Sequence, residues 1–209
     1  MTGVLVNTDL VKAGQEPKAY KDFADPRWKD NIIALTPKIS GMGNYWYTII
    51  GRGVLGTKPY AGPDYLDKMN GQKVRWVNNY DDGANLVARG EAPVYFPVLT
   101  VSAARLREAK APIKFLQMTE GSFASQYGWG VVKNAPHPNA AKLFINWLGT
   151  MDGQKALDAM GDIPLRSDAP VSIPENETKG VTLLWFETDE SDAALYPALK
   201  EAEDFFGLK

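Results

Sequence analysis

Residues 31–53 read NIIALTPKISGMGNYWYTIIGRG, and this stretch decides the predicted fold. Its first part, residues 32–35, is apolar throughout, which is typical of a strand buried on both faces of a parallel sheet. Pro37 ends the run, and the turn at residues 40–44 leads into a helix predicted to reach residue 52. The first N–H groups of a helix lack partners and favour an anion. The stretch therefore predicts an anion-binding turn, although such junctions also occur in α/β proteins that bind nothing there.

The composition is that of a globular protein and excludes several function classes. The 209 residues are 44% hydrophobic and 23% charged, with a net charge of −2. The basic residues are dispersed, so no nucleic-acid partner is predicted, and no apolar run approaches the roughly 20 residues that span a bilayer. Cysteine is absent, which excludes thiolate chemistry and fits an oxidising compartment. The start MTGVLVNTDLV lacks the basic and long apolar parts of a signal peptide, so none is predicted.

The residues after the first stretch continue an alternation of helices and strands. The predicted helices lie at 64–69, at 102–109, and between these two, where residues 78–82 cap a helix that runs through residue 88. The predicted strands lie at 73–77, 93–99 and 113–118. That alternation predicts a parallel-type α/β sheet with right-handed crossovers. Ligands of such sheets bind beyond the carboxyl ends of the strands, here residues 40–44, 78–82 and 98–101.

The two ends of the chain lie outside this alternation. A strand is predicted at residues 3–8, before the first stretch. Residues 125–132 are predicted to be extended, and two helices are predicted between residues 134 and 160. A final amphipathic helix is predicted at residues 191–206.

Nothing in the sequence predicts catalysis. His137 is the only histidine, and it stands between two prolines at a predicted helix start, which favours a surface cap over a catalytic base. No GxSxG, HExxH or Walker-type motif is present, and the carboxylates are scattered. We therefore predict that the protein is not an enzyme and has no catalytic residues, no metal site and no cofactor.

Four motifs in a fixed order carry a resemblance to a known family. They are VNTDLV at 6–11, FADPRWKDNIIALTPKISG at 23–41, NNYDDGANLVARGEAPV at 78–94 and VVKNAPHPNAAKLFINWLGTMDGQKAL at 131–157. Together they resemble the extracellular solute-binding proteins of ABC importers, which have the type II periplasmic-binding fold. The last motif is the most specific, and the resemblance extends from residue 6 to about residue 168.

The resemblance implies a two-lobed protein that closes on a small-molecule solute at a hinge and presents it to an ABC permease of the inner membrane. Residues 1–120 resemble the family's second, ligand-binding α/β lobe with its hinge strand. Residues 121–209 resemble the return crossing and the helical remainder of the first lobe. The implied fold class is α/β, with one complete parallel-type lobe and one incomplete lobe, and the implied location of the full-length parent is periplasmic or extracellular.

The family's opening section has no counterpart in this sequence, so we interpret the chain as truncated. Apolar faces around residues 143–148 and 183–186 would then lack the partner that covers them in the family. Exposed apolar surface of that size favours association. We therefore predict a homo-oligomer or a poorly ordered region after about residue 165.

The resemblance also limits the classes of ligand that are expected. Iron(III) binders of the family place two tyrosines after the strand that follows a GE-P motif, and that alignment puts Thr100 and Val101 there. Neither supplies a phenolate, so ferric ion bound in that manner is not expected. The turn at Ser40 and Gly41 matches the place where family members hold an anion, so the resemblance implies a small organic anion or zwitterion bearing a phosphonate, phosphate or carboxylate. The predicted ligand-binding residues are Ser40, Gly41, Met42, Gly43, Asn44, Asn78, Asn79, Tyr80, Asp81, Thr100 and Tyr127.

Two alternatives stay open from the sequence. A polyamine or thiamine-like cation could bind Asp81 and Asp82, although helix capping is the favoured role of these two residues. The same fold also serves as the effector-sensing domain of transcription regulators. Tyr80, Trp46 and Tyr127 are predicted either as aromatic walls of the site or as core residues.

Overall fold

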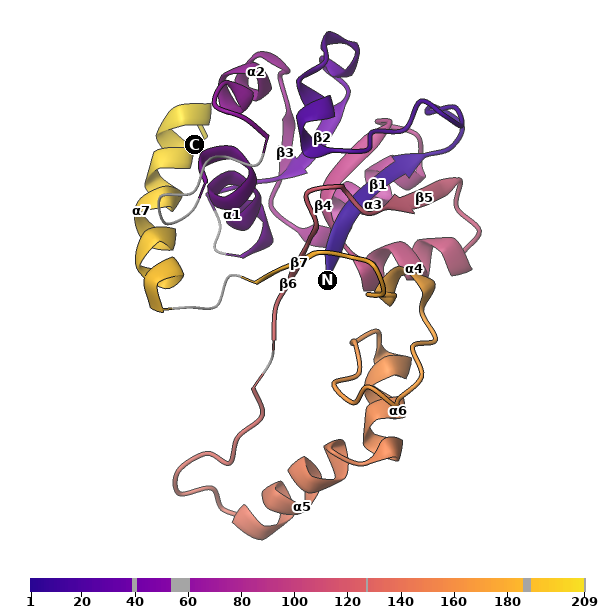
Figure 1. Cartoon of the computed structure of the whole chain (residues 1–209), viewed down its shortest axis with the longest axis vertical. Helices are drawn as coiled ribbons and strands as arrows, with labels where there is room; N and C mark the ends of the chain where they lie inside the picture. Colours follow the sequence, from indigo (N-terminus) through magenta and orange to yellow (C-terminus); the bar gives the residue numbers. More distant parts are fainter. Residues whose placement is uncertain (39–40, 54–60, 127, 186–188, 209) are drawn as a thin grey trace.

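The computed structural model describes residues 1–38, 41–53, 61–126, 128–185 and 189–208 (Figure 1). Its centre is a five-stranded sheet in the order β3-β2-β4-β1-β5. The strands are β1 (Thr2–Asn7), β2 (Ile32–Leu35), β3 (Arg75–Val77), β4 (Val94–Leu99) and β5 (Ile113–Leu116). Every strand predicted between residues 3 and 118 is therefore present, with bounds that differ by a few residues.

The sheet is parallel with one exception, which is β1. β2 runs parallel to β3 and β4, whereas β1 is antiparallel to both β4 and β5. The prediction of a parallel-type sheet is confirmed for the strands after residue 31, and the sheet as a whole is mixed. All six residues of β1 are buried, as expected for a strand with neighbours on both edges and cover on both faces.

Short helices connect the strands, and those after residue 41 begin or end close to the predicted residues. They are η1 (Tyr20–Ala24), η2 (Pro26–Trp28), α1 (Met42–Tyr45), the π-helix η3 (Trp46–Arg52), α2 (Tyr65–Gly71), α3 (Tyr80–Ala88) and α4 (Thr100–Glu108). The single helix predicted to end at residue 52 is thus an α-helical turn that continues as a π-helix.

Aromatic side chains fill the core between the sheet and these helices. Phe96 of β4 is fully buried and stacks on Phe23 with ring centroids 4.6 Å apart. Tyr20 meets the same ring at 5.8 Å, and Trp46 meets it at 5.4 Å. Because Trp46 is fully buried in this cluster, it is a core residue and not an aromatic wall of a site.

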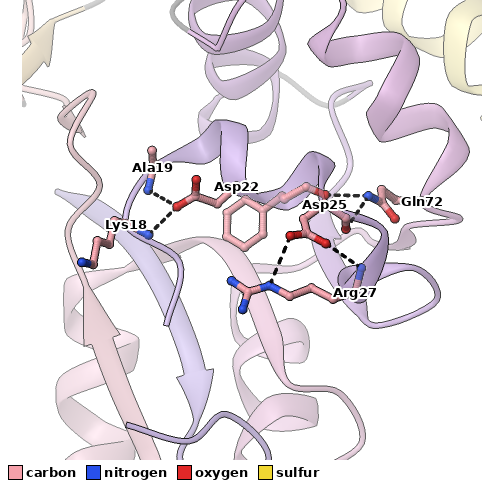
Figure 2. A network of polar contacts seen from close by, with 7 residues as sticks. Lys18, Ala19, Asp22, Asp25, Arg27 and Gln72 are labelled. Carbon is pink, nitrogen blue, oxygen red and sulfur yellow. Dashed lines mark hydrogen bonds and ion pairs between the residues drawn. The ribbon is translucent and has the colours of Figure 1, made fainter. Parts of the chain in front are cut away.

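A polar network fixes the segment that leads into β2 (Figure 2). The Gln72 side-chain amide donates to the carbonyls of Phe23 and Asp25, each at 2.9 Å. The Asp22 carboxylate accepts from the backbone N–H groups of Lys18 and Ala19 at 2.8 and 3.0 Å. These bonds hold η1 and η2 against the end of α2, at the edge of the sheet opposite to the carboxyl ends of its parallel strands.

A helical hairpin stands apart from the sheet (Figure 1). It consists of α5 (Pro138–Leu148) and α6 (Met151–Met160), which pack on each other. The chain reaches it from β6 (Ser122–Ala124) and returns through η4 (Pro174–Asn176) to β7 (Leu183–Trp185), which pairs in parallel with β6. The described residues between 125 and 132 form no strand. The sequence predicted an extended segment there and named no strand, and an extended segment becomes a strand only where another strand pairs with it.

The five-stranded sheet and the helices between its strands are called the sheet unit below. The final helix, α7 (Asp189–Phe206), packs on α1 and η3 of this unit. Its Phe206 ring lies 4.9 Å from the ring of Trp76 and 6.2 Å from that of Trp46. Arg52 of η3 pairs with Glu201 at 2.8 Å. These contacts join α7 to helices and strands between residues 42 and 77, and the predicted division of the chain at residue 120 stays a prediction. No helix within the described ranges is both long and apolar enough to cross a membrane.

Candidate functional site

Three helices begin at the carboxyl edge of the sheet. β2, β3 and β4 are parallel, so the turns that follow them lie along one edge. α1 begins after Gly41, α3 after Asn79 and α4 after Leu99. β1 runs in the opposite direction and starts at this edge, where the Thr100 N–H donates to the Met1 carbonyl at 3.1 Å. The structure therefore brings the predicted segments 41–44, 78–82 and 98–101 to one edge.

The turn before α1 is joined to the start of α3 by Tyr80. The Tyr80 hydroxyl accepts a hydrogen bond from the Met42 N–H at 3.3 Å. Gly41 has a φ of 111°, a conformation that favours glycine. A Cβ at this position would also lie 2.9 Å from the Tyr80 hydroxyl. The predicted residue Ser40, which precedes this turn, lies outside the described residues, as does Tyr127.

Gly43 and Asn44 shape the turn from inside. A Cβ on Gly43 would lie 2.4 Å from the Thr36 carbonyl oxygen, so the helix approaches the end of β2 too closely for a side chain. Asn44 is fully buried, and its amide donates to the Pro37 carbonyl at 3.0 Å. Asn44 Oδ1 and Thr36 Oγ1 have no hydrogen-bond partner among the described residues. These residues fix the backbone of the turn, and their side chains are not exposed.

The start of α3 is exposed and negatively charged. The Asn79 side chain accepts from the Asp81 N–H at 2.8 Å, so Asn79 is the N-cap, as its residue type favours. The prediction that Asp81 or Asp82 caps this helix was wrong. Asp81 instead accepts from the Ser102 hydroxyl at 2.6 Å, which links α3 to α4. Asn78 is exposed beside the cap.

The start of α4 contributes buried groups. Thr100 is the first residue of the helix and is only 2% exposed. Ser102, which the sequence analysis did not select, is 4% exposed and bonds to Asp81. The available signal was a serine in the first turn of a helix that follows a strand, where such residues bond locally. Val101 packs against Gly161 at the end of α6, and a Cβ added to Gly161 would lie 2.4 Å from Val101 Cγ2.

The carboxylates at the start of α3 also act on a buried phenol of the sheet, that of Tyr95. Burial raises the pKa of Tyr95 on β4 well above its usual range, and the nearby Tyr80, Asp81 and Asp82 raise it further. Tyr95 therefore stays protonated at neutral pH. The carboxyl edge of the sheet therefore combines two kinds of charged group. Its exposed carboxylates attract cations, whereas the helix N-termini attract anions.

A cavity of about 150 Å³ lies between the start of β1 and the hairpin. Its lining includes Met1, Gln126, Trp129, Leu157 and Asp162, so it joins the sheet edge to α6 and the irregular segment after β6. Within the part of the chain that the structure describes, no three His, Asp or Glu residues form a group able to hold a metal ion. His137 occupies the N-cap position of α5, but its side chain makes no capping hydrogen bond.

Known proteins share this architecture. The periplasmic binding protein AfuA from Actinobacillus pleuropneumoniae, solved with exogenous fructose-6-phosphate bound, is 21% identical with a TM-score of 0.73, over 100% of this chain and 66% of that one. A periplasmic thiamin binding protein is 17% identical with a TM-score of 0.65, over 98% of this chain and 63% of that one. These likenesses confirm the predicted type II periplasmic-binding fold, of which this chain spans about two thirds.

Sequence comparison gives the family. An uncharacterized protein of Haemophilus influenzae is 28% identical over 163 residues, which is 77% of this chain and 46% of that protein. The chain thus spans about half the length of this relative. The family described as bacterial extracellular solute-binding protein matches residues 4–161, which is well over half of the chain. The chain therefore belongs to the bacterial extracellular solute-binding protein family.

Proposed function

We propose that this chain is the solute-gripping part of an ABC importer's binding protein and holds a small organic anion or zwitterion at the carboxyl edge of the sheet. The observation that carries the proposal is the meeting of three helix starts at that edge, tied together by Tyr80–Met42 and Asp81–Ser102. The implied partner is an ABC permease of the inner membrane. The implied location of the whole protein is the periplasm or the extracellular space.

The charges at the edge suit a solute that carries both signs. Backbone N–H groups at helix N-termini favour a phosphate, phosphonate or carboxylate. Asp81 and Asp82 are exposed beside them and would repel a simple anion but attract an ammonium group. The fructose-6-phosphate bound to the similar AfuA supports an organic phosphate as the anionic part.

A cation is the second candidate, and the exposed carboxylates favour it. A polyamine or thiamine-like solute would place its positive charge between Asp81 and Asp82 at the first turn of α3. The likeness to a periplasmic thiamin binding protein is consistent with this alternative. In that case Asp81→Asn would weaken binding, whereas changes at the turn before α1 would have little effect.

Calorimetric titration of the 209-residue protein separates the two candidates. The solutes are fructose 6-phosphate, inorganic phosphate, spermidine and thiamine. Gly41→Ala distorts the turn, because Gly41 has a φ of 111° and its new Cβ would meet the Tyr80 hydroxyl. Gly62→Ala is the matched control: Gly62 has a φ of 96°, but open space surrounds it.

The proposal expects a phosphate-bearing solute to bind, with affinity lowered at least about tenfold in Gly41→Ala and unchanged in Gly62→Ala, a loss typical of one charge-assisted contact. Binding of spermidine or thiamine alone, lost in Asp81→Asn, would favour the cation. Binding of phosphates with equal affinity in both glycine variants would place the site away from this edge.

A further inference from the structure

The short helix η4 and its flanks lie between the hairpin and the sheet unit. This segment, residues 172–177, follows the loop after α6 and precedes β7. It contains two buried side chains, Glu175 and Asn176, in a stretch that is otherwise irregular. Buried polar groups in a loop need partners, and here the partners come from two different parts of the molecule.

On one side, η4 is bonded to α6. The Asp158 carboxylate is 4% exposed and accepts from the Ser172 N–H at 3.0 and 3.1 Å. The Asn176 amide donates to the Gly161 carbonyl at 3.0 Å, at the residue that ends α6. These bonds make η4 part of the hairpin's base.

On the other side, η4 is bonded to α4 and the end of β5. Arg107 Nε donates to one oxygen of Glu175 at 2.8 Å, and its NH2 group donates to the other at 3.4 Å. The Glu175 side chain is 7% exposed, whereas that of Arg107 is 43% exposed. The Gln117 amide donates to the Glu177 carbonyl at 3.2 Å. A two-pronged contact restricts orientation as well as distance.

We propose that the Arg107–Glu175 pair is a latch that fixes the α5–α6 hairpin relative to the carboxyl edge of the sheet. The hairpin is joined to the rest of the chain only through residues 125–137 and 161–182, whose described parts are largely irregular. A carboxylate this buried loses most of its hydration and needs its partner. When Arg107 releases it, η4 separates from α4, and the hairpin moves with η4 because Asp158 and Asn176 hold the two together.

The latch also affects the carboxyl edge of the sheet, because the base of the hairpin lies next to that edge. Gly161 lies against Val101, at the start of α4 and next to the three helix starts. Movement of the hairpin base therefore changes access to this edge and the shape of the adjoining cavity. The latch itself rests on the contacts of η4 and not on the proposed solute, so it is tested without a ligand.

The chain has no cysteine, so a pair of introduced cysteines can be labelled specifically. Lys142→Cys on α5 and Asn85→Cys on α3 are both at exposed positions and carry spin labels for distance measurement by electron paramagnetic resonance. In this background we compare Arg107→Gln, the charge swap Arg107→Glu with Glu175→Arg, and Arg105→Gln. Arg105 is the matched control, because it is exposed on the same helix and makes no ion pair within the described residues.

The latch predicts one narrow distance distribution for the parent and for Arg105→Gln. It predicts a broadened or shifted distribution for Arg107→Gln, at least partly restored by the charge swap. Amide exchange at Ser172 should rise at least about tenfold in Arg107→Gln, while the β4 amides keep their protection, as for local opening. If Arg107→Gln does not fold, Arg107→Lys, which keeps the charge and loses the second prong, replaces it. If Arg107→Gln (or Arg107→Lys in its place) kept the parent's distribution, or if the charge swap gave a distribution as broad as that of the single variant, the latch would be overturned.

Discussion

The sheet unit and the α5–α6 hairpin contain similar apolar residues with opposite environments. In the sheet unit, Phe96 is fully buried among other rings. In the hairpin, Leu143, Phe144 and Trp147 are 72%, 47% and 40% exposed, and their described ring contacts come from Trp129 and from one another. The difference shows that an apolar face is buried only when another element covers it.

This exposed face is where association was predicted. The homo-oligomer stays a prediction, and the comparisons add no support to it. The alternative, a poorly ordered region after about residue 165, also stays a prediction; the described residues there include η4, β7 and α7.

The largest difference between the two regions is expected from one substitution made in each. Phe96→Ala removes a buried ring and should lower the free energy of unfolding by about 3–5 kcal/mol. Phe144→Ala removes a half-exposed ring and should cost about 1 kcal/mol or less. Urea unfolding followed by circular dichroism measures both. Equal losses would mean that the hairpin face is covered in solution.

A second pair compares how closely backbones approach. Gly43→Ala puts a Cβ 2.4 Å from the Thr36 carbonyl oxygen, so we expect a loss of about 1–3 kcal/mol. Gly149→Ala, after α5, has its nearest contact at 3.4 Å and a φ of −72°, so it should stabilise by about 0.4–1 kcal/mol. Thermal unfolding of the two variants should move in opposite directions, and a Gly43→Ala protein as stable as the parent would show that the turn relaxes.

The helix caps test whether the hairpin unfolds independently. Thr150 accepts from the Gly153 N–H at 3.2 Å and caps α6, while Asn79 caps α3. Each change to alanine should cost about 1 kcal/mol. Amide exchange should rise within α6 alone for Thr150→Ala, because the hairpin is covered by few neighbours. Faster exchange throughout the sheet in Thr150→Ala would show that the two regions unfold together.

The smallest effects are expected from surface ion pairs titrated by pH. The Lys114 ammonium, 2.8 Å from Glu16, together with backbone N–H groups, lowers the pKa of Glu16 to about 2. Arg166 lowers the pKa of Asp168 in the same way near the hairpin. A carboxyl group whose pKa is lowered by folding stabilises the folded state at pH values above its ordinary pKa. The contribution of Glu16 should therefore be complete above about pH 4.5 and disappear as the pH falls towards 2.

Nuclear magnetic resonance titration of the side-chain carboxyl groups measures these pKa values directly. Lys114→Met should return the pKa of Glu16 towards its ordinary value and leave that of Asp168 unchanged. Arg166→Met should do the reverse. A Glu16 titration unaffected by Lys114→Met would show that the backbone N–H groups alone hold its pKa down.

Local patterns were sufficient for most elements of the sheet unit. The apolar run at 32–35 and the polar turns after each strand determined where strands end and helices begin. They did not reveal that Asn79 and not Asp81 caps α3, because both residue types favour that position. They also did not reveal Ser102, whose bond to Asp81 joins two helices that are distant in sequence.

The sequence by itself determined the five strands of the main sheet, the glycines of the turn and the family, because periodicity, turn residues and the order of motifs are read directly along the chain. It did not predict β6 or β7. The tertiary structure alone decided that β1 runs antiparallel between β4 and β5, that α7 covers Trp46 and that the segment after Ala124 is not a strand. These features depend on which elements meet in space. Hydrogen bonds between strands and the burial of an apolar face both require a partner that a local pattern does not specify.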